Sequence, residues 1–425
     1  MGRLRSPKFI FLAALAIRAA VVTYFYRTTS FTLATIWNVA YEMAHVGANV
    51  AAGAGFSSPF QEPTGPTAIL PPGYPALLAG IFRMFGTMTA TSAAVAVGLN
   101  LLFSALTCVV IFFLAKRTLG ENAAVIAAWI WAVYPPVILS AGFHVWDGTL
   151  TTLLAACVFL LATKMTSPPR PVNAGRGEGG ATARDWAVFA VVWGGGALVN
   201  PSVLAIGGAV WLWAVWKERA VRNGMIAATI AVVMLAPWGI RNYRIFHRVW
   251  PVRSNFGEEL WIGNHPGADG YFRVLLYPLG NGAELMQYQR RGEAGYMEWK
   301  QREAMAFIRA HPGEFLRLTV HRMSCIWGGV RDAGYDPIFL PTTLLGLTGL
   351  LLLARRDRGL MWFFLLPLLI YPIPYYVTHP DLRFRFPMEP LLTCLSGYAV
   401  VVIAECVRER ARAKALVHAA PNSRS

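Results

Sequence analysis

Long apolar segments separated by short polar stretches run along almost the whole chain. Most have roughly the 17–25 residues that a helix needs to cross a bilayer. The predicted spans lie near 9–26, 90–114, 122–140, 148–163, 185–199, 202–216, 224–240, 336–354, 359–377 and 387–405. The pattern therefore predicts an all-α polytopic membrane protein with about ten transmembrane helices.

The basic residues orient these spans. With the N-terminus inside, every inner connection is basic, as the positive-inside rule requires. Those connections contain 116–117, 164–184, 217–222, 355–358 and 408–414. The other connections then lie outside, at 27–89, 144–147, 241–335 and 379–386. The pair 185–199 and 202–216, split by Asn200-Pro201, is either two spans or one re-entrant hairpin, and the side of the other spans is the same in both cases.

This threading divides the chain into four parts. Residues 1–240 form an N-terminal bundle, which includes the first outer loop at 27–89 and a flexible Gly/Pro/Arg-rich inner linker at 164–184. An outer or interfacial segment, 241–335, follows, and its amphipathic stretch 313–327 favours a position against the membrane surface. The C-terminal spans occupy 336–407, and a basic inner tail occupies 408–425.

Composition agrees with a membrane bundle. Hydrophobic residues make up 56% of the chain and charged residues 14%, with a mean hydropathy of +0.45, whereas a soluble chain carries about 25% charged residues. The net charge of +16 is interpreted as topology signals and ligands for anionic lipid rather than for nucleic acid. The five cysteines show no metal or disulfide spacing. No small-residue cleavage site precedes Tyr24, so we expect a retained N-terminal anchor.

The stretch 37–77 combines a short helix with a rigid loop and resembles the edge of an active site. Glu42, His45 and Asn49 share one face of a predicted helix from Tyr41 to Ala52. Beyond it, glycines and prolines favour turns and extended backbone. Glu42 is a carboxylate that can accept a proton beside the bilayer; the alternative is a solvated interfacial acid.

Three further groups of charged residues stand out. Asp147 lies in a short outer turn. It is a functional acid, a cap of the helix that follows, or both. Arg383 and Arg385 stand at the outer mouth of the last span with His379, either as a clamp for a phosphate or as interfacial anchors. Arg18 lies within the first span, where a charge is costly unless it faces the bundle interior or the span boundary is shifted.

The run at 237–264 places arginines and aromatic residues at a membrane edge. This composition suits a polyprenyl-phosphate headgroup as well as ordinary anchoring. The chain has no P-loop, no Gly-x-Gly-x-x-Gly after a strand, no His-Glu-x-x-His and no Gly-x-Ser-x-Gly. These absences argue against ATP-driven transport and the common hydrolases.

Several motifs together resemble a known family. They are YEMAHVGANVAAGAGFSSPF, GPTAILPPGYPALLAGIF, HVWDGTLTTLL, LVNPSVL, PWGIRNY, FGEELWIGN and RFRFPMEPLL. The chain resembles bacterial membrane glycosyltransferases of the GT-C superfamily, in the family 39-like group related to protein O-mannosyltransferases and lipid A aminoarabinose transferases. The resemblance implies a GT-C bundle with a helical first periplasmic loop and a periplasmic segment before the last three spans.

The resemblance also implies an activity. Such enzymes transfer a sugar from a polyprenyl phosphate on the periplasmic face of the inner membrane, to a lipid, glycan or protein acceptor. Their first outer loop supplies an essential acid, and Glu42 occupies that place, although Asp is more usual there. Asp147 matches a second acidic position. In the implied single displacement, Glu42 accepts the proton of the acceptor, and the arginines stabilise the departing phosphate. The candidate residues are Glu42 and Asp147 for catalysis, Arg383, Arg385 and Arg241 for the donor phosphate, and His45, Tyr74 and His379 for substrate binding.

Two other classes remain open. A lipid-diphosphate-linked polysaccharide polymerase or ligase would depend more on 241–335 than on Glu42. A lipid-linked sugar transporter or flippase needs polar residues through the bundle, whereas the charged groups gather at one face. No cofactor is required by the scheme, and a divalent metal held by Glu42 and Asp147 stays open.

Overall fold

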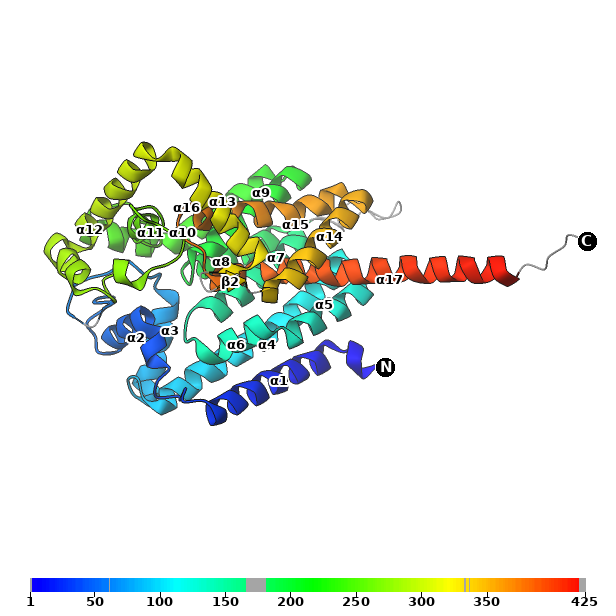
Figure 1. Ribbon diagram of the computed structural model, residues 1–425, viewed down its shortest axis with the longest axis horizontal. Helices are drawn as coiled ribbons and strands as arrows, with labels where there is room; N and C mark the ends of the chain where they lie inside the picture. The colour runs from blue at the N-terminus through cyan, green and yellow to red at the C-terminus, as the bar shows by residue number, and fades with distance from the viewer. Residues whose placement is uncertain (1, 61, 166–180, 332–333, 336, 420–425) are drawn as a thin grey trace, which may run out of the picture.

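The computed structural model describes residues 2–60, 62–165, 181–331, 334–335 and 337–419. Its helices form an elongated bundle, and both termini lie at the same end of it (Figure 1). We call this the terminal end; the opposite end, where α2 (Trp37–Ala51) lies, is the loop end. The central part of the expected inner linker, 166–180, and the end of the basic tail, 420–425, fall outside the described residues.

Helices account for most of the described chain. The bundle contains α1 (Pro7–Thr28), α4 (Ala90–Thr118), α5 (Glu121–Val133), α6 (Pro135–Phe143), α7 (Gly148–Met165), α8 (Ala183–Ala197), α9 (Pro201–Glu218), α10 (Val221–Phe246), α14 (Leu340–Arg356), α15 (Arg358–Ile370) and α17 (Glu389–Ala419). The loop end adds α2, α3 (Gly73–Phe85), α11 (Phe256–Gly263), α12 (Gly282–Ala310), α13 (Pro312–Gly328) and α16 (Ile373–Val377). The short elements are the 3-10 helices η1 (Arg3–Arg5), η2 (Val274–Leu276), η3 (Pro337–Phe339) and η4 (Leu382–Arg385), and the antiparallel strands β1 (Val330–Arg331) and β2 (Gly334–Tyr335).

Each predicted span corresponds to a helix or to a bent pair of helices. Seven helices of the described chain are long and apolar enough to cross a membrane, and the α5–α6 pair makes an eighth if it is counted as one span. Helices α8 and α9 are not among them. The all-α, polytopic class is therefore confirmed. The count of ten spans is not confirmed, since length and composition give seven or eight among the described residues.

The bend between α5 and α6 explains the charge inside the first span. The two helices meet at 45°, where Pro135 and Pro136 lack the N–H groups that would bond the carbonyls four residues earlier. The fully buried Arg18 donates hydrogen bonds to those carbonyls, on Trp131 at 3.1 Å and on Ala132 at 3.0 Å. Arg18 therefore faces the bundle interior, which was one of the two expectations for it.

The first loop is held in place through its backbone. Arg241, near the end of α10, donates to the carbonyls of Phe56 at 2.9 Å and Thr67 at 2.7 Å. The next N–H, of Ala68, donates to the buried Glu293 carboxylate of α12 at 2.8 Å. The loop makes some backbone hydrogen bonds within itself, such as that from the N–H of Thr67 to the carbonyl of Phe56 at 3.0 Å. These side chains bond further polar groups of its backbone. The loop is thereby fixed over the end of the bundle, with α2 beside it.

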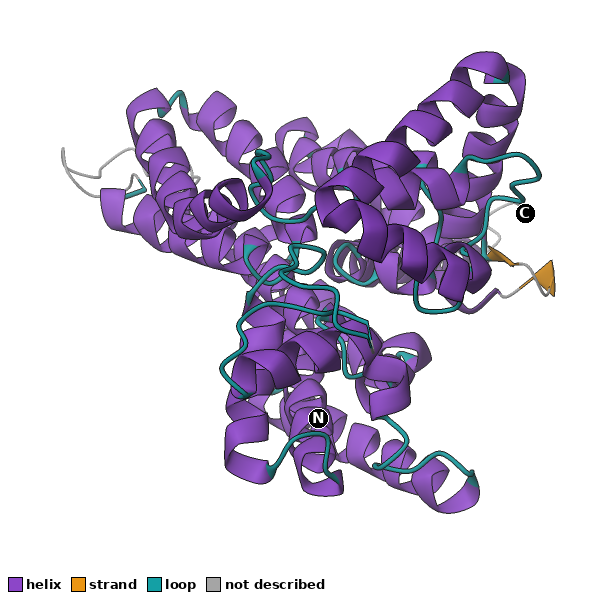
Figure 2. Ribbon diagram, turned by 90° about the vertical axis from the view of Figure 1, so that its left-hand side faces the viewer, coloured by secondary structure: helices purple, strands orange, loops and turns teal. Residues whose placement is uncertain are grey.

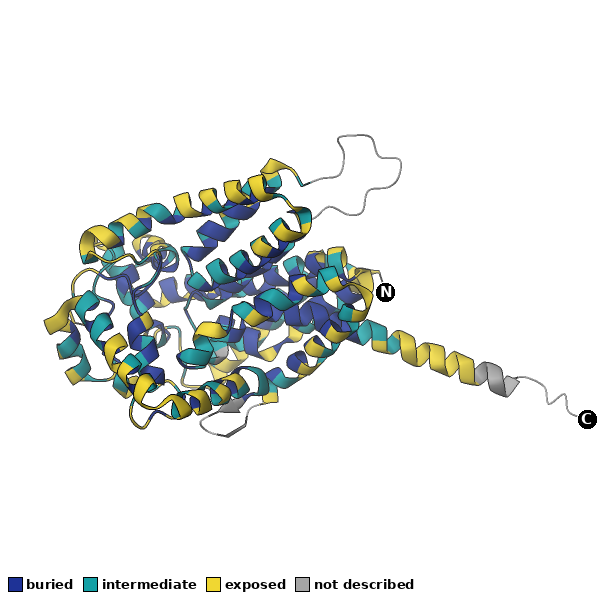
Figure 3. Cartoon of the chain, turned by 90° about the horizontal axis from the view of Figure 1, so that it is seen from above, coloured by how far each residue is buried: buried dark blue, intermediate teal, exposed yellow. Residues whose placement is uncertain are grey.

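Helix α17 begins in the core and runs well past the bundle at the terminal end (Figure 1). Its side chains are buried from Glu389 to Ala399 and exposed from Glu405 to Lys414, as the change of colour in Figure 3 shows. The described part of the basic tail is therefore a continuation of the last membrane helix.

Candidate active site

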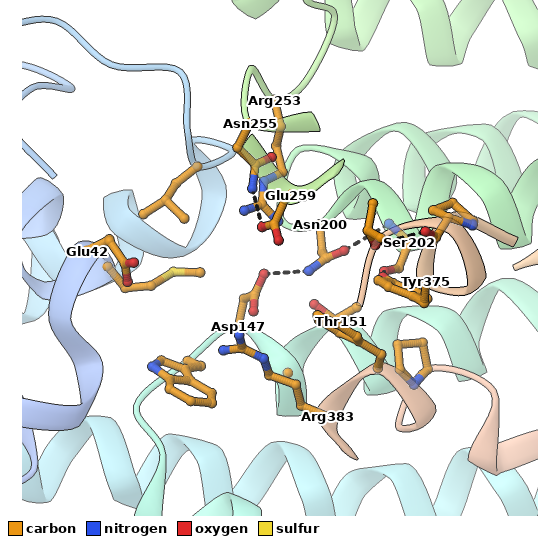
Figure 4. Close-up of a pocket in the computed structure, with 18 of the residues that line it drawn as sticks. Glu42, Asp147, Thr151, Asn200, Ser202, Arg253, Asn255, Glu259, Tyr375 and Arg383 are labelled. Carbon is orange, nitrogen blue, oxygen red and sulfur yellow. Dashed lines mark hydrogen bonds between the residues drawn. The ribbon is translucent and has the colours of Figure 1, made fainter. Parts of the chain in front are cut away.

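The loop end encloses a cavity of about 230 Å³. Figure 2, which looks onto this end, shows connecting loops gathered at its centre among the helices. The cavity wall combines α2, the start of α7, the turn before α9, α11 and the chain around α16 (Figure 4). Its polar side chains include Glu42, Asp147, Thr151, Asn200, Ser202, Arg253, Asn255, Glu259, Tyr277, Tyr375, His379 and Arg383. Segments far apart in the sequence therefore meet at one polar site.

Glu42 enters the cavity from α2, on the side opposite Ser202 and Tyr375 (Figure 4). Helix α2 packs closely on α3, since a Cβ at Gly47 would lie only 2.9 Å from the Cβ of Leu78. Burial, reinforced by the negative charge of Glu42, raises the pKa of the neighbouring Tyr277 well above its usual value. The first-loop carboxylate thus faces the cavity.

Asp147 stands at the beginning of α7 and is 8% exposed. Its carbonyl accepts the N–H of Thr151 at 2.8 Å, but its carboxylate accepts the Nδ2 hydrogen bond of Asn200 at 2.7 Å. Burial raises the pKa of Asp147, against the opposing effects of the Asn200 hydrogen bond and the positive charges of Arg253 and Arg383. The side chain therefore belongs to the cavity and not to the first turn of the helix.

Asn200 is aimed at Asp147 by the helix that it caps. Its Oδ1 accepts the N–H of Ser202 at 2.8 Å, and Pro201 occupies the first position of α9, an arrangement typical of helix N-termini. The first loop reaches the same turn through Gly73, whose N–H donates to the carbonyl of Leu198 at 2.8 Å. A Cβ at Gly73 would lie 2.9 Å from that oxygen, so the close approach requires glycine.

Two arginines bring positive charge to the cavity. The guanidinium of Arg383 lies 4.2 Å from the ring of Trp146, whose Nε1 donates to the carbonyl of Val39 in α2 at 2.9 Å. Burial would lower the pKa of Arg383, but nearby carboxylates, those of Asp381 and Glu42 first, raise it. Arg253 is anchored by Nε, which donates to the carbonyl of Ile69 at 2.7 Å. Both arginines therefore bring their guanidiniums to the cavity wall.

A third acid in the wall, Glu259, is paired with a histidine. Glu259 Oε2 lies 2.6 Å from Nε2 of the buried His379, and Glu259 Oε1 accepts a hydrogen bond from Asn255 at 2.6 Å. Burial acts to raise the pKa of Glu259, but the His379 pair and the neighbouring arginines bring it below its usual value. The neighbouring Glu258 has no such partner, and burial raises its pKa well above normal.

Two of the predicted phosphate-binding arginines lie outside the cavity wall. Arg385 is 1% exposed, and its Nε donates to Glu389 at 2.6 Å while its Nη1 donates to Thr343 at 2.8 Å. Arg241 uses its guanidinium to hold the first-loop backbone, as described above. Only Arg383 of the three is brought to the cavity.

Of the predicted substrate-binding residues, His379 lines the cavity and the other two lie behind it. Tyr74 is buried in α3 and donates its hydroxyl to Asn100 at 3.3 Å. His45 lies on α2 with its ring 5.8 Å from that of Tyr41, and burial lowers its pKa while the charge of Glu42 opposes the shift.

Several wall residues had no role assigned from the sequence. Arg253, Asn255 and Glu259 lie in the run 237–264, where basic, amide and acidic groups follow one another within seven residues at a membrane edge. Asn200 was recognised only as a break between two spans. In the run 237–264 and at Asn200, polar residues lie at the ends of predicted spans on the outer side, and this position could have identified them as site residues.

The acids of the cavity do not form a set of metal ligands. Within the described residues, no group of three or more His, Cys, Asp or Glu side chains is arranged to hold a metal ion. Asp147 and Glu259 are each hydrogen-bonded to neighbours, and Arg253 and Arg383 add positive charge to the same wall. The cavity therefore offers no set of three such ligands among the described residues.

Sequence comparison finds no matching family model. No curated protein matches the chain either.

Solved structures are similar in fold. An Archaeoglobus fulgidus oligosaccharyltransferase, solved with Zn and sulfate, matches with a TM-score of 0.56 and 13% identity, over 96% of this chain and 51% of that one. The enzyme AglB from the same organism, complexed with an inhibitory peptide and a dolichol-phosphate, matches with a TM-score of 0.54 and 14% identity, over 98% and 53%. ArnT from Cupriavidus metallidurans gives a TM-score of 0.38 at 14% identity, over 89% and 76%. The chain spans about half the length of the archaeal proteins. This likeness shows that the chain has the GT-C membrane fold that its motifs predicted.

Proposed function

We propose that this protein is a glycosyltransferase that moves a sugar from a polyprenyl-phosphate donor to an acceptor. The reaction takes place on the periplasmic face of a bacterial inner membrane, with the N-terminus in the cytoplasm. The observation that carries the proposal is the cavity at the end of the membrane bundle. Its wall brings the Glu42 carboxylate of the first loop together with two arginines, Arg253 and Arg383. The fold supports it, since an archaeal protein of similar fold was solved with dolichol-phosphate.

Glu42 acts as the general base in this scheme. An acceptor oxygen attacks the anomeric carbon, its proton passes to the Glu42 carboxylate, and the bond from that carbon to the phosphate oxygen breaks. Asp147, held by Asn200 at 2.7 Å, places negative charge near the sugar, where positive charge develops at the anomeric carbon in the transition state. The two acids thereby have separate roles, which their positions on different walls allow.

Arg383 and Arg253 bind the donor phosphate. The bond that breaks leaves its electron pair on a phosphate oxygen, and two guanidiniums stabilise that charge through charge-assisted hydrogen bonds. Arg253 takes the place that the sequence suggested for Arg385 and Arg241, whose donors are used by other protein groups. No step is assigned to a metal, because no set of three or more metal ligands is found among the residues that the structure describes.

The size of the cavity favours a single sugar. Its volume of about 230 Å³ lies below the ~300–1,000 Å³ typical of pockets for drug-sized ligands. His379 and Glu259 offer a donor and acceptor pair to the sugar hydroxyls. A hexose or a pentose fits this description, and the acceptor approaches from the aqueous side.

A lipid-diphosphate-linked polymerase or ligase is the second candidate. It is favoured by one observation, namely that Arg253, Asn255 and Glu259 of the 241–335 segment contribute a whole wall of the cavity. Such an enzyme would require diphosphate donors and would remain active without Glu42.

The test is sugar transfer by the purified protein in lipid, with radiolabelled polyprenyl-phosphate sugars and a membrane extract as acceptor. Glu42→Gln should lower transfer about 10²–10⁴-fold, the usual contribution of a general base. Glu62→Gln is the matched control, because Glu62 is an exposed acid of the same loop outside the cavity wall. Full transfer by folded Glu42→Gln protein, or transfer from diphosphate donors alone, would contradict the proposal.

A further inference from the structure

Arg322 is a buried arginine without an acidic partner. It lies in α13, is 0% exposed, and forms no ion pair with any residue that the structure describes. Burial lowers its pKa to about 10. Because an isolated buried charge is unfavourable, its hydrogen-bond partners must account for its presence.

Those partners are the C-terminal ends of two short helices. Nη1 donates to the carbonyls of Tyr376 at 3.2 Å and Val377 at 3.3 Å, at the end of α16. Nη2 donates to the carbonyl of Gly263 and, at 3.2 Å, to Oδ1 of Asn264, at the end of α11. The last carbonyls of a helix lack partners within it and carry partial negative charge, so a guanidinium stabilises both ends at once.

The two helix ends are also in direct contact. Asn264 Nδ2 donates to the carbonyls of Leu260 at 2.8 Å and Val377 at 2.7 Å. A Cβ at Gly263 would lie 1.8 Å from the carbonyl oxygen of Thr378, so only glycine permits this approach. The junction therefore fixes the backbone of α11 relative to α16 with little freedom.

This junction lies directly behind a pair of side chains in the cavity wall. Glu259 precedes Gly263 by about one helical turn, and His379 follows Val377 by two residues. Their side chains meet at 2.6 Å and line the cavity, whereas Arg322 does not. Arg322 thus lies where it can set the geometry of the pair without touching a substrate.

We propose that Arg322 is a positioning residue that holds Glu259 and His379 together in the cavity wall by joining the ends of α11 and α16. Its consequence for sugar transfer rests on the proposed function, but the positioning itself does not. Without Arg322, three acceptors at the junction lose their donor, and the Val377 carbonyl keeps only the hydrogen bond from Asn264. The helix ends then separate, and the Glu259–His379 pair opens.

The test measures the exposure of His379 and needs no substrate. Purified protein in lipid is treated with diethyl pyrocarbonate, and modification of each histidine is followed by mass spectrometry, with the exposed His247 as internal reference. In Arg322→Met, we expect His379 to react at least about tenfold faster than in wild type, because local opening exposes a group that the native contacts protect.

Arg18→Met is the matched control. Arg18 is equally buried and also donates to helix-terminal carbonyls, but those belong to α5, away from the α11–α16 junction. His379 should stay protected in this variant even though its stability falls. Equal protection of His379 in Arg322→Met and wild type, or equal exposure in Arg18→Met, would overturn the positioning role.

Two milder variants keep the test decisive if Arg322→Met does not fold. Asn264→Ala removes the direct link between the helix ends and should also expose His379. Arg322→Lys retains the charge with a single nitrogen, which cannot serve both helix ends, so it should give intermediate exposure. Unchanged protection of His379 in both variants would contradict the proposal. If no sugar transfer is found with any donor, the proposed function fails while this result stands.

Discussion

Replacing Asn200 with serine separates the two duties of one side chain. Serine caps a helix about as well as asparagine does, so α9 should keep its N-terminal hydrogen bond to the N–H of residue 202. The shorter side chain cannot span the 2.7 Å contact that Asn200 Nδ2 makes with Asp147. The perturbation therefore removes a donor from a carboxylate that is 8% exposed.

The size of the effect follows from that contact. A hydrogen bond to a charged group contributes about 1.5–3 kcal/mol, which corresponds to a pKa change of roughly 1–2 units. Burial already raises the pKa of Asp147, and the Asn200 donor opposes that shift by favouring the ionised form. Losing the donor raises the pKa further, so ionisation, and with it activity, should require a higher pH.

The assay is a pH profile of sugar transfer. The acid limb for Asn200→Ser should lie roughly 1–2 pH units above that of wild type, with a similar plateau at high pH. Asn281→Ser is the control, since Asn281 also caps a helix, accepting the N–H of Ala283 at 2.9 Å, and does not line the cavity. An acid limb at the wild-type pH in well-folded Asn200→Ser protein would refute the assigned role of Asp147.

Three other substitutions test the arginines. Arg383→Gln should weaken binding of polyprenyl phosphate by about tenfold or more through loss of a charge-assisted contact. Fluorescence of Trp146, whose ring lies 4.2 Å from the Arg383 guanidinium, can follow the titration. Unchanged affinity would show that Arg383 does not bind the phosphate. Arg385→Gln should instead lower the midpoint of thermal unfolding, because it leaves the fully buried Glu389 without its partner; normal stability with lost lipid binding would reverse this assignment. Arg18→Met should lower the free energy of unfolding by ~1–3 kcal/mol, since it leaves the buried carbonyl of Ala132 without a donor and that of Trp131 with only the 3.4 Å bond from the N–H of Tyr134. An unshifted unfolding midpoint would show that another group bonds the Ala132 carbonyl.

The sequence predicted the carboxylates of the cavity better than its arginines. Acids are scarce outside the polar connections, so Glu42 and Asp147 stood out, and both line the cavity. Arg383 and Arg385 were predicted either to clamp a phosphate together or to serve as interfacial anchors. They lie in the 3-10 helix η4, where two residues correspond to a rotation of about 240°. One therefore faces the cavity and the other the core.

The remaining site residues depend on contacts that no local pattern carries. Glu259 and His379 are 120 positions apart, and their pairing requires α11 and α16 to meet. Likewise, the membrane helices were predicted with nearly correct ranges because apolar runs are local, whereas the cavity depends on the packing of chain segments over the bundle. Hydropathy determines where the helices lie, and side-chain bonding across them determines which polar groups meet.

The two hydrogen bonds from Arg18 to the carbonyls before the bend make this arginine and the adjacent Pro135 and Pro136 dependent on one another, although they lie far apart in the sequence. An arginine in the first helix is a liability if the prolines are replaced, since the carbonyls then regain helical partners and the guanidinium keeps only its other contacts. Prolines without the arginine leave the Ala132 carbonyl without a donor and the Trp131 carbonyl with only the N–H of Tyr134. Related chains should therefore keep the arginine and the two prolines together or lack all three.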